Sequence, residues 1–409
     1  MILLAVGFGC LVWAGAMFLF GRYAVGRNEI TLVEREKQPE FAVLIPARDE
    51  SAVIEGLLES LEKQTVKIKT EDVYVIVETK DDPTVEICRK HGAGVFVRPK
   101  VTLSRARKGF ALDEVIRDIL SKRRYDLYFI FDADNVLAPE FMEGMLESYM
   151  AGYEIITGYR NAKNGNANAI AAVSCLTFSM INTLVNRDRA KHQANIVFSG
   201  TGYCIDGKLV DRWQDWPFRS LTEDYEISLY ATLHGLATYY NEAAVFYDEQ
   251  PTRYTQTVAQ RVRWIKGYFS ARKKYVPLMR GVLSKRRAKN GTRNAGSLAK
   301  ECIGVKPAIL AVVGAVLVVL GGVVMLGRRG EWGWALAVVG VAFVLLYIIL
   351  AGVTVHILRQ EKLDLARSMK IKIVLFNPLY LVTYVPCALK ALLRREVAWV
   401  KIEHGAEQP

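Results

Sequence analysis

Two carboxylates one residue apart, Asp132 and Asp134, follow an apolar stretch in the first half of the chain. Carboxylate oxygens are ligands that Mg²⁺ and Mn²⁺ favour, and an ion held there could also bind a diphosphate. Alone, the Asp-Ala-Asp triplet is weak evidence, because short acidic triplets at strand ends are often ordinary turn residues. A metal site and a plain turn are therefore both open for this triplet.

Two further motifs that could take part in the same reaction follow later in the chain. The triplet Thr222-Glu223-Asp224 begins 90 residues after Asp132, and the pentapeptide 260–264 (Gln-Arg-Val-Arg-Trp) begins 36 residues after Asp224. A carboxylate can take a proton from an attacking hydroxyl, and arginine donates paired hydrogen bonds to phosphate. The broad face of tryptophan packs on the C–H face of a sugar. Singly, a surface acidic cap and an amphipathic helix with a buried Trp explain these motifs as well.

Together the three motifs, in this order, resemble those of processive family 2 glycosyltransferases, which include cellulose, chitin and hyaluronan synthases. The resemblance covers roughly residues 40–274, with apolar segments on both sides. It implies an α/β, GT-A (Rossmann-like) glycosyltransferase domain flanked by transmembrane helices. It also implies a UDP-sugar donor and Mg²⁺ or Mn²⁺ as cofactor.

The resemblance gives each matching acid a role. Asp134 corresponds to the metal-ligand carboxylate, and Asp132 to the carboxylate that meets both metal and nucleotide. Asp224, which closes its triplet, corresponds to the general base. Because one candidate base is present and no second carboxylate is placed as a nucleophile, we expect transfer with inversion.

The pentapeptide supplies donor and acceptor contacts in the same comparison. Gln260 and Arg263 correspond to residues that contact the donor pyrophosphate, and Trp264 to the aromatic floor under the acceptor sugar. One short helix can present all three side chains.

Five other residues fit the family less sharply. Lys108 lies where relatives carry a basic donor-binding loop, although a solvated lysine is the ordinary alternative. Thr201-Gly202 belongs to a small-residue loop expected to line the acceptor site, although a plain turn fits nearly as well. Glu50 and Glu78 lie where relatives bind the nucleoside, but many relatives have two consecutive aspartates where this chain has Glu78-Thr79.

The elements that must position these residues are βα units. Apolar runs predict strands at Phe41–Ile45, Val73–Val77 and Tyr128–Phe131, and a helical stripe predicts a helix over Ser51–Glu62. Ligands of parallel sheets bind outside the carboxyl ends of the strands. Each of the three predicted strands is followed by acids, so we expect the site at this edge of a parallel sheet.

Apolar segments on both sides of this region predict membrane helices. The uncharged stretch Met1–Phe20 precedes Arg22 and Arg27, which favours an anchor whose C-terminal end faces the cytoplasm. The runs Val305–Leu326 and Gly333–Leu358 predict a helical hairpin. The stretch Ile371–Leu393 contains two prolines, so a kinked helix and an interfacial segment are equally open.

The formal net charge of +12 is concentrated in one place. Residues 261–306 carry 14 Lys or Arg and one acid, a net charge of +13. This basic segment adjoins the first C-terminal span, which indicates contact with a lipid bilayer rather than nucleic acid. The predicted domains are an anchor (1–28), a cytoplasmic GT-A domain (29–274), a basic interfacial segment (275–304), C-terminal transmembrane helices (305–393) and a tail (394–409).

The expected protein is a multi-pass enzyme of the cell membrane with a glycan or a lipid as acceptor. A β-linked polysaccharide is the leading product, because Gln-x-x-Arg-Trp is typical of synthases that hold a growing chain. Few spans are present for secretion through the protein's own channel unless subunits pair, so a homo-oligomer is also considered. The alternatives are a glycolipid synthase resembling ceramide glucosyltransferases and a scaffold with an inactive transferase domain, which the intact motifs disfavour.

Overall fold

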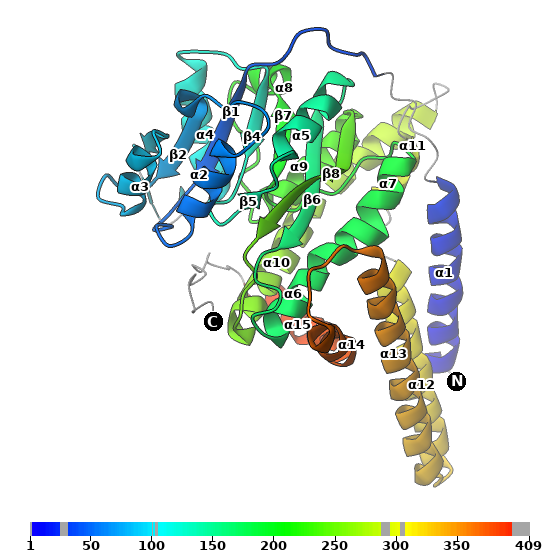
Figure 1. Ribbon diagram of the computed structural model, residues 1–409. Coiled ribbons are helices and arrows are strands. Elements are labelled where there is room, and N and C mark those ends of the chain that lie inside the picture. Colours follow the sequence, from blue (N-terminus) through cyan, green and yellow to red (C-terminus); the bar gives the residue numbers. More distant parts are fainter. Residues whose placement is uncertain are drawn as a thin grey trace.

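An eight-stranded sheet forms the centre of the computed structural model, which describes residues 2–24, 32–99, 101–102, 105–287, 295–302 and 307–394 (Figure 1). The strand order is β3-β2-β1-β4-β7-β6-β8-β5. The strands are β1 (Phe41–Pro46), β2 (Val73–Val77), β3 (Gly94–Val97), β4 (Leu127–Ile130), β5 (Val136–Leu137), β6 (Ile155–Ala162), β7 (Tyr203–Asp206) and β8 (Thr238–Asp248).

The sheet is parallel in one half and mixed in the other. β1 pairs in parallel with both β2 and β4, and β2 with β3, as the sequence predicts. β7 pairs antiparallel with β4 and with β6, so a parallel sheet is the wrong description beyond β4. Residues 200–202, which lead into β7, lie beside the C-terminal end of β4. β7 must therefore run antiparallel to β4.

The predicted elements agree with the observed ones to within a few residues. β2 has the predicted bounds, β1 extends one residue further, and β4 lies one residue earlier than expected. Helix α2 (Ile54–Glu62) begins three residues late, because residues 51–53 form a turn. The predicted stripe of Val53, Leu57, Leu58 and Leu61 is buried, and all but Val53 lie within the helix.

Helices cover both faces of the sheet, because side chains alternate along each strand. Val43 and Ile45 of β1 point to a core that also contains α2, α3 (Thr84–Lys90) and α5 (Phe141–Met150). Ala42 and Leu44 point to a second core with α4 (Lys108–Leu120), α8 (Gly207–Trp213) and α9 (Glu223–His234). A 3₁₀ turn, η1 (Thr70–Asp72), leads into β2.

Three further helices flank this sheet domain. α6 (Ala169–Ile181) continues through a π-helical turn, η3 (Asn182–Asn186), into α7 (Arg187–Lys191). α10 (Tyr254–Arg287) runs without a break across the predicted domain boundary at residues 274–275. α11 (Ala295–Cys302) packs on α9 and α10 through a small core around Leu298 and Met279.

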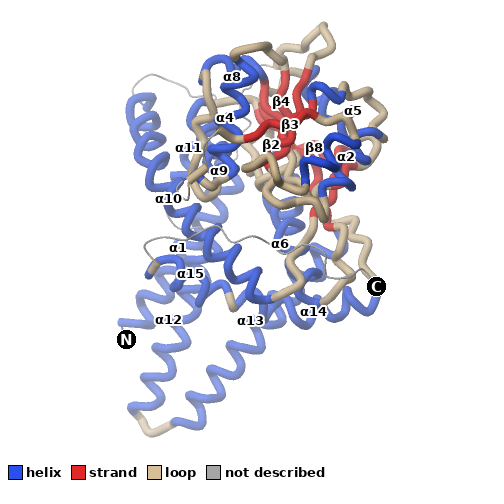
Figure 2. Tube along the Cα trace, turned by 90° about the vertical axis from the view of Figure 1, so that its left-hand side faces the viewer, coloured by secondary structure: helices blue, strands red, loops and turns tan. Residues whose placement is uncertain are grey.

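The remaining helices lie on one side of the sheet domain. They are α1 (Ile2–Ala24), α12 (Pro307–Arg328), α13 (Trp332–Gln360), α14 (Arg367–Val382) and α15 (Tyr384–Leu393). Figures 1 and 2 show α12 and α13 as a hairpin that extends away from the domain, with α1 beside α12. Residues 1 and 25–28 of the predicted anchor and residues 395–409 of the predicted tail lie outside the described residues.

α1 and α12 approach closely at glycines. A Cβ added at Gly314 would lie 2.8 Å from the carbonyl oxygen of Gly7, and one added at Gly321 would lie 2.8 Å from Leu4 Cγ. Small residues let membrane helices pack backbone to backbone. The anchor and the hairpin thus form one helical unit.

Three stretches among the described residues are long and apolar enough to cross a membrane: Ala169–Lys191, α13, and Arg367–Leu393. The first is 50% buried inside the protein and the third 28%, whereas the α13 window is 0% buried. These helices are candidate membrane spans by their length and composition. Within Ile371–Leu393, for which the sequence left a kinked helix and an interfacial segment open, the helix breaks at Thr383. Figure 2 shows α14 lying across the direction of the hairpin.

Four asparagines, from the end of β6 to the start of α6, join the apolar helices to the sheet domain. Asn161 and Asn166 donate to the chain just after α13, whereas Asn164 and Asn168 donate to the chain just before α10. The accepting carbonyls are those of Lys362, Asp364, Gln250 and Thr252, at 3.2, 2.9, 2.8 and 3.0 Å respectively. One loop therefore holds both segments.

An ion pair also fixes the end of the hairpin. Glu361, whose side chain is 0% exposed, lies 3.0 Å from Arg187 Nη1 at the start of α7. Arg187 also pairs with Glu242 on β8, whose side chain is 48% exposed. The first residue after α13 is thus bound directly to the sheet domain.

Candidate active site

The predicted acids meet at one edge of the sheet. Because β1 is parallel to β2 and to β4, their carboxyl ends share an edge, and Glu50, Glu78 and Asp132 follow these three strands. This part of the sequence prediction is confirmed by the topology.

Glu50 and Glu78 are half-buried. The Glu50 backbone N–H donates to Thr84 Oγ1 at 3.0 Å, and the Glu78 carboxylate accepts from Arg48 and, at 3.5 Å, from Arg98. A carboxylate between two arginines is fixed in place. The nucleoside-binding role of both residues stays a prediction.

Lys108 lies at the Asp-Ala-Asp triplet, and its donor-binding role stays a prediction. Its Nζ is 2.6 Å from Asp132 Oδ1 and 2.6 Å from the carbonyl oxygen of Gly200. Asp134 Oδ1 accepts from Asn135 at 3.1 Å, and Asp134 Oδ2 accepts from the backbone of Glu249 at 3.2 Å. Both carboxylates are thus positioned by Lys108 and Glu249 on two other segments and by the adjacent Asn135.

The donor set of this triplet fits a hard divalent ion. Asp132 and Asp134 offer carboxylate oxygens, and the Asp132 side chain is 42% exposed. In the described part of the chain, no group of three or more His, Cys, Asp or Glu gathers that could hold a metal alone. An ion at this triplet would therefore take its other ligands from a bound diphosphate and water.

The predicted small-residue loop lies between the triplet and Asp224. Thr201 is fully buried, and its hydroxyl accepts from the Asp132 backbone N–H at 2.7 Å. A Cβ at Gly202 would overlap the ring of Phe246, and one at Gly200 would lie 3.5 Å from Asp224 Oδ2. The Thr201 hydroxyl thus fixes the backbone of Asp132, and Gly200 is the residue of this loop that lies beside Asp224. The acceptor role of Thr201 and Gly202 stays a prediction.

Glu223 and Asp224 form the first turn of α9, where the helix dipole favours negative charge. Glu223 is buried and Asp224 is half-buried. Burial raises the pKa of both carboxyls, and the charge of Asp224 raises the pKa of Glu223 further. Lys108 and Arg263 oppose both shifts. A carboxylate with a raised pKa that is still accessible is suited to accept a proton.

α10 brings the pentapeptide to this edge. Arg263 Nη1 donates to the carbonyl oxygen of Leu221 at 3.3 Å, just before the Thr-Glu-Asp triplet. A Cβ at Gly267 would lie 2.8 Å from Thr222 Cβ and closer still to its methyl and hydroxyl groups. α10 therefore crosses the start of α9 in close contact, one turn after Arg263.

Trp264 and Gln260 are half-buried on the same helix. The Trp264 ring meets Phe178 of α6 edge to face, with 5.7 Å between ring centroids. This contact orients the indole, whose acceptor role stays a prediction, as does the donor role of Gln260.

Sequence reasoning missed a second ion pair at the site. Arg160 Nε donates to Asp248 Oδ2 at 2.9 Å, and its guanidinium carbon lies 3.5 Å from the centroid of Phe178. Arg160 also donates to the carbonyl oxygen of Ser199, beside Gly200. Asp248 ends a strand, which was a usable signal, but nothing in the sequence marks Phe178 or pairs Arg160 with Asp248.

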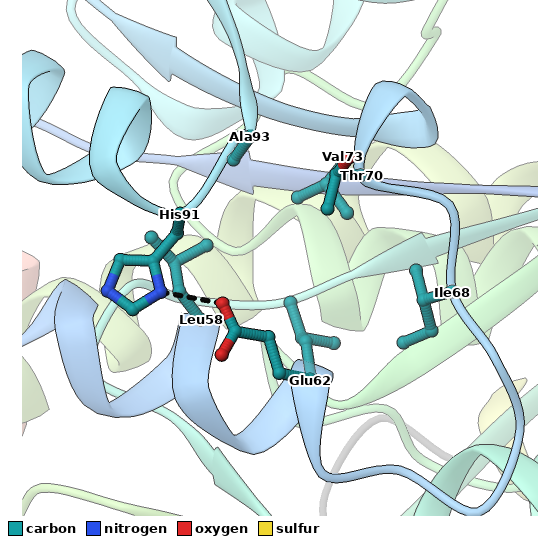
Figure 3. Close-up of a pocket in the computed structure, with 8 residues that line it drawn as sticks. Leu58, Glu62, Ile68, Thr70, Val73, His91 and Ala93 are labelled. Carbon is teal, nitrogen blue, oxygen red and sulfur yellow. Dashed lines mark hydrogen bonds and ion pairs between the residues drawn. The ribbon is translucent and has the colours of Figure 1, made fainter.

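A small pocket elsewhere is not part of this site. Figure 3 shows it between α2 and the start of β2, with His91 Nδ1 2.7 Å from Glu62 Oε1. Val73, which lines it, begins β2, whereas the acids follow the other end of that strand. The pocket therefore lies at the amino edge of the parallel strands.

Comparisons with known proteins agree with this arrangement. The "Probable glycosyltransferase YdaM" of Bacillus subtilis (strain 168) is 22% identical over 241 residues, which are 56% of this chain. The match spans 55% of that protein, about half of its length.

A solved structure supports the fold. The mannosyltransferase PcManGT from Pyrobaculum calidifontis, in complex with GDP-Man and Mn²⁺, is 15% identical, with a TM-score of 0.60 over 96% of this chain and 100% of that chain. Glucosyl-3-phosphoglycerate synthase from Mycobacterium tuberculosis, with Mn²⁺ and UDP, is 18% identical, with a TM-score of 0.40 over 57% of this chain and 80% of that chain.

The fold is that expected of a GT-A enzyme, and Asp132, Asp134, Asp224 and Arg263 lie at one edge of its sheet. The sequence profile described as "Glycosyltransferase like family 2" matches residues 39–267, more than half of the chain. The predicted GT-A fold and enzyme class are confirmed, and the chain belongs to glycosyltransferase family 2.

Proposed function

We propose that this chain is a membrane-bound inverting glycosyltransferase that moves a sugar from a UDP-sugar to an acceptor hydroxyl. The observation that carries the proposal is the position of Asp224. It lies across Gly200 from Lys108 and Asp132, and Arg263 is bonded to the segment just before it. A base, a diphosphate-binding group and an acceptor platform thus share one edge of the sheet.

The donor diphosphate is assigned to the Asp132 side of the site. When bound at Asp132 and Asp134, Mg²⁺ or Mn²⁺ would neutralise charge on the departing diphosphate. Lys108, 2.6 Å from Asp132 Oδ1, is a second cation within reach of the same phosphates. Arg263 supplies paired donors that fit phosphate oxygens.

Proton transfer is assigned to Asp224 rather than Glu223. Glu223 is 7% exposed, whereas Asp224 is half-buried and its Oδ2 faces Gly200. Asp224 takes the proton from the acceptor hydroxyl as that oxygen attacks the anomeric carbon and the bond to the diphosphate breaks. One displacement without a carboxylate nucleophile inverts the anomeric centre.

Trp264 is assigned to the acceptor sugar. Its edge-to-face contact with Phe178 fixes the indole on the turn that carries Arg263, so one turn of α10 serves both substrates. Holding the acceptor hydroxyl near the donor lowers the entropic cost of the reaction.

A growing glycan is the leading acceptor, and a lipid-linked acceptor is the second candidate. The glycan is favoured by the Gln260–Trp264 motif. The lipid is favoured by α14 and α15, which pack beneath α6 and α10 and expose apolar side chains, including Ile371, Phe376, Val385 and Leu389. The basic residues around the hairpin support a cytoplasmic catalytic domain in a multi-pass protein of the cell membrane.

Membranes that contain the full chain should be incubated with labelled UDP-sugars, GDP-mannose and Mn²⁺. We expect label from one UDP-sugar in a product, either a polymer resistant to organic extraction or a lipid that is extracted. Transfer only from GDP-mannose would contradict the UDP assignment. No transfer from any donor, with donor binding intact, would contradict the enzyme proposal.

A further inference from the structure

One arginine of the pentapeptide faces away from the donor and acceptor. Arg261 is 0% exposed and is among the largest fully buried side chains of the protein. On a helix, residues two apart point to nearly opposite sides, so Arg261 and Arg263 cannot serve the same ligand. A buried cation must be matched by other groups, because its burial alone is costly.

The partners of Arg261 come from the joint between α14 and α15. Its Nη1 donates to Thr383 Oγ1 at 2.7 Å, and its guanidinium carbon lies 4.3 Å from the ring centroid of Tyr380 and 4.9 Å from that of Tyr384. Nε and Nη2 donate to Thr257, one turn back on α10, each at 3.2 Å. Aromatic faces and hydroxyls together hold the charge.

Two neighbouring contacts extend this interface along α15. Val262 packs with Cys387 and Ala391, and Lys266 Nζ donates to the carbonyl oxygen of Arg394 at 2.8 Å. The turn of α10 that contains Arg263 and Trp264 is therefore held between the α14–α15 pair on one side and Leu221 with Phe178 on the other.

We propose that Arg261 is a positioning residue, which fixes the Arg263–Trp264 turn against the α14–α15 joint. The role rests on the proposed function, because its effect on turnover requires sugar transfer. Without this contact the turn shifts, and a shift of about 1 Å in a substrate-positioning group can reduce turnover by about 100-fold. Transfer to the acceptor should fall more than hydrolysis of the donor, because water does not have to be held by Trp264.

The test compares Arg261→Gln with Arg272→Gln in the purified full chain. Arg272 is a buried arginine on the same helix, but it holds Glu301 of α11, donating to its carbonyl oxygen at 2.7 Å. We expect Arg261→Gln to lower the ratio of sugar transfer to donor hydrolysis by about tenfold or more, and to raise the KM for acceptor, with UDP affinity unchanged. Arg272→Gln should lower Tm without changing the ratio.

Two further variants keep the test decisive if Arg261→Gln does not fold. Arg261→Lys retains a cation near the tyrosines but loses the fork to Thr383 and Thr257, so it should restore the ratio only in part. Thr383→Val should shift the ratio in the same direction. An unchanged ratio in all of these variants, with a loss of Tm like that of Arg272→Gln, would overturn the proposal.

Hydrogen exchange separates this proposal from the proposed function, because it needs no turnover. In Thr383→Val and Arg261→Lys, amides of residues 254–266 and 384–393 should exchange faster together, while those of α11 stay protected. If this coupling is seen but the wild type transfers no sugar, the proposed function fails and the contact stands. If exchange is unchanged, the positioning role fails whatever the activity.

Discussion

At the scale of single residues, the candidate site sets three cations beside acids. Lys108 is paired with Asp132, Arg263 lies near Glu223 and Asp224, and Arg160 is paired with Asp248. The motif residues were predictable because only a few side-chain types can perform each step. Arg160 and Phe178 were not, since their partners are set by strand register and helix packing.

The two acids of α9 predict a pH dependence. A base works when ionised, so turnover is present above its pKa and lost as pH falls through it. Because burial raises the pKa of Asp224, the acid limb of kcat should lie above the ordinary carboxyl range of about 4. Burial and the charge of Asp224 raise the pKa of Glu223 to about 7, so Glu223 is neutral at the pH where Asp224 titrates, and Glu223→Gln should leave the acid limb in place. An acid limb within the ordinary carboxyl range, or one that disappears in Glu223→Gln, would contradict the assignment of this limb to Asp224.

The carboxylate pair predicts metal-dependent donor binding. Asp134→Asn should weaken UDP binding in the presence of Mn²⁺ by at least about tenfold, because even groups outside the ligand shell typically contribute that much. Chelator should have the same effect on the wild type. Calorimetry with UDP measures this without turnover, and Asp118→Asn, on α4 and paired with Lys122, is the charge-matched control. Equal UDP affinity with and without Mn²⁺ would rule out the metal site.

At the scale of elements, the crossing of α9 and α10 sets the geometry of the site. Apolar runs that end in polar turns predicted β1, β2 and β4, and hence the acidic edge. The mixed half of the sheet was not predictable, because the direction of β7 depends on where residues 200–202 lie. The buried face of α10 was not predictable either, because its amphipathic stripe is weak. One face of the helix carries Arg261 and the opposite face Arg263.

This crossing predicts different outcomes for two glycines on α10. In Gly267→Ala the new methyl group would overlap Thr222, which should destabilise the protein by about 1–3 kcal/mol and reduce transfer. In Gly281→Ala nothing lies within 4 Å of the new methyl, so stability should hold or rise by up to about 1 kcal/mol. Thermal unfolding and transfer assays of both variants test this, and equal behaviour would show that the crossing is not tight.

At the scale of the whole molecule, the membrane side and the sheet domain are joined at defined points. The sequence predicted the hairpin because its apolar runs are long, but it left residues 371–393 open. Their contact with α10 depends on Arg261, Tyr380 and Thr383, which no periodicity marks. The asparagine loop and Glu361 complete the connection.

Glu361 predicts how strongly the hairpin end is held. Glu361→Gln removes the buried partner of Arg187 and should lower the free energy of unfolding by about 3 kcal/mol. Glu242→Gln removes the exposed partner of the same arginine and should cost less than about 1 kcal/mol. The free energies of unfolding of both variants, measured in the same detergent, give the comparison. A larger loss for Glu242→Gln would mean that Glu361 does not anchor the hairpin.

The proposed reaction requires Asp224 to be the base of an inverting transfer. The most direct measurement is turnover of purified Asp224→Asn beside the wild type, with UDP affinity and the anomeric configuration of the wild-type product followed by NMR. We expect UDP affinity near that of the wild type, transfer lower by about 10² to 10⁴, and a β-linked product from an α-linked donor. Transfer near wild-type levels in Asp224→Asn, or an α-linked product, would contradict the account.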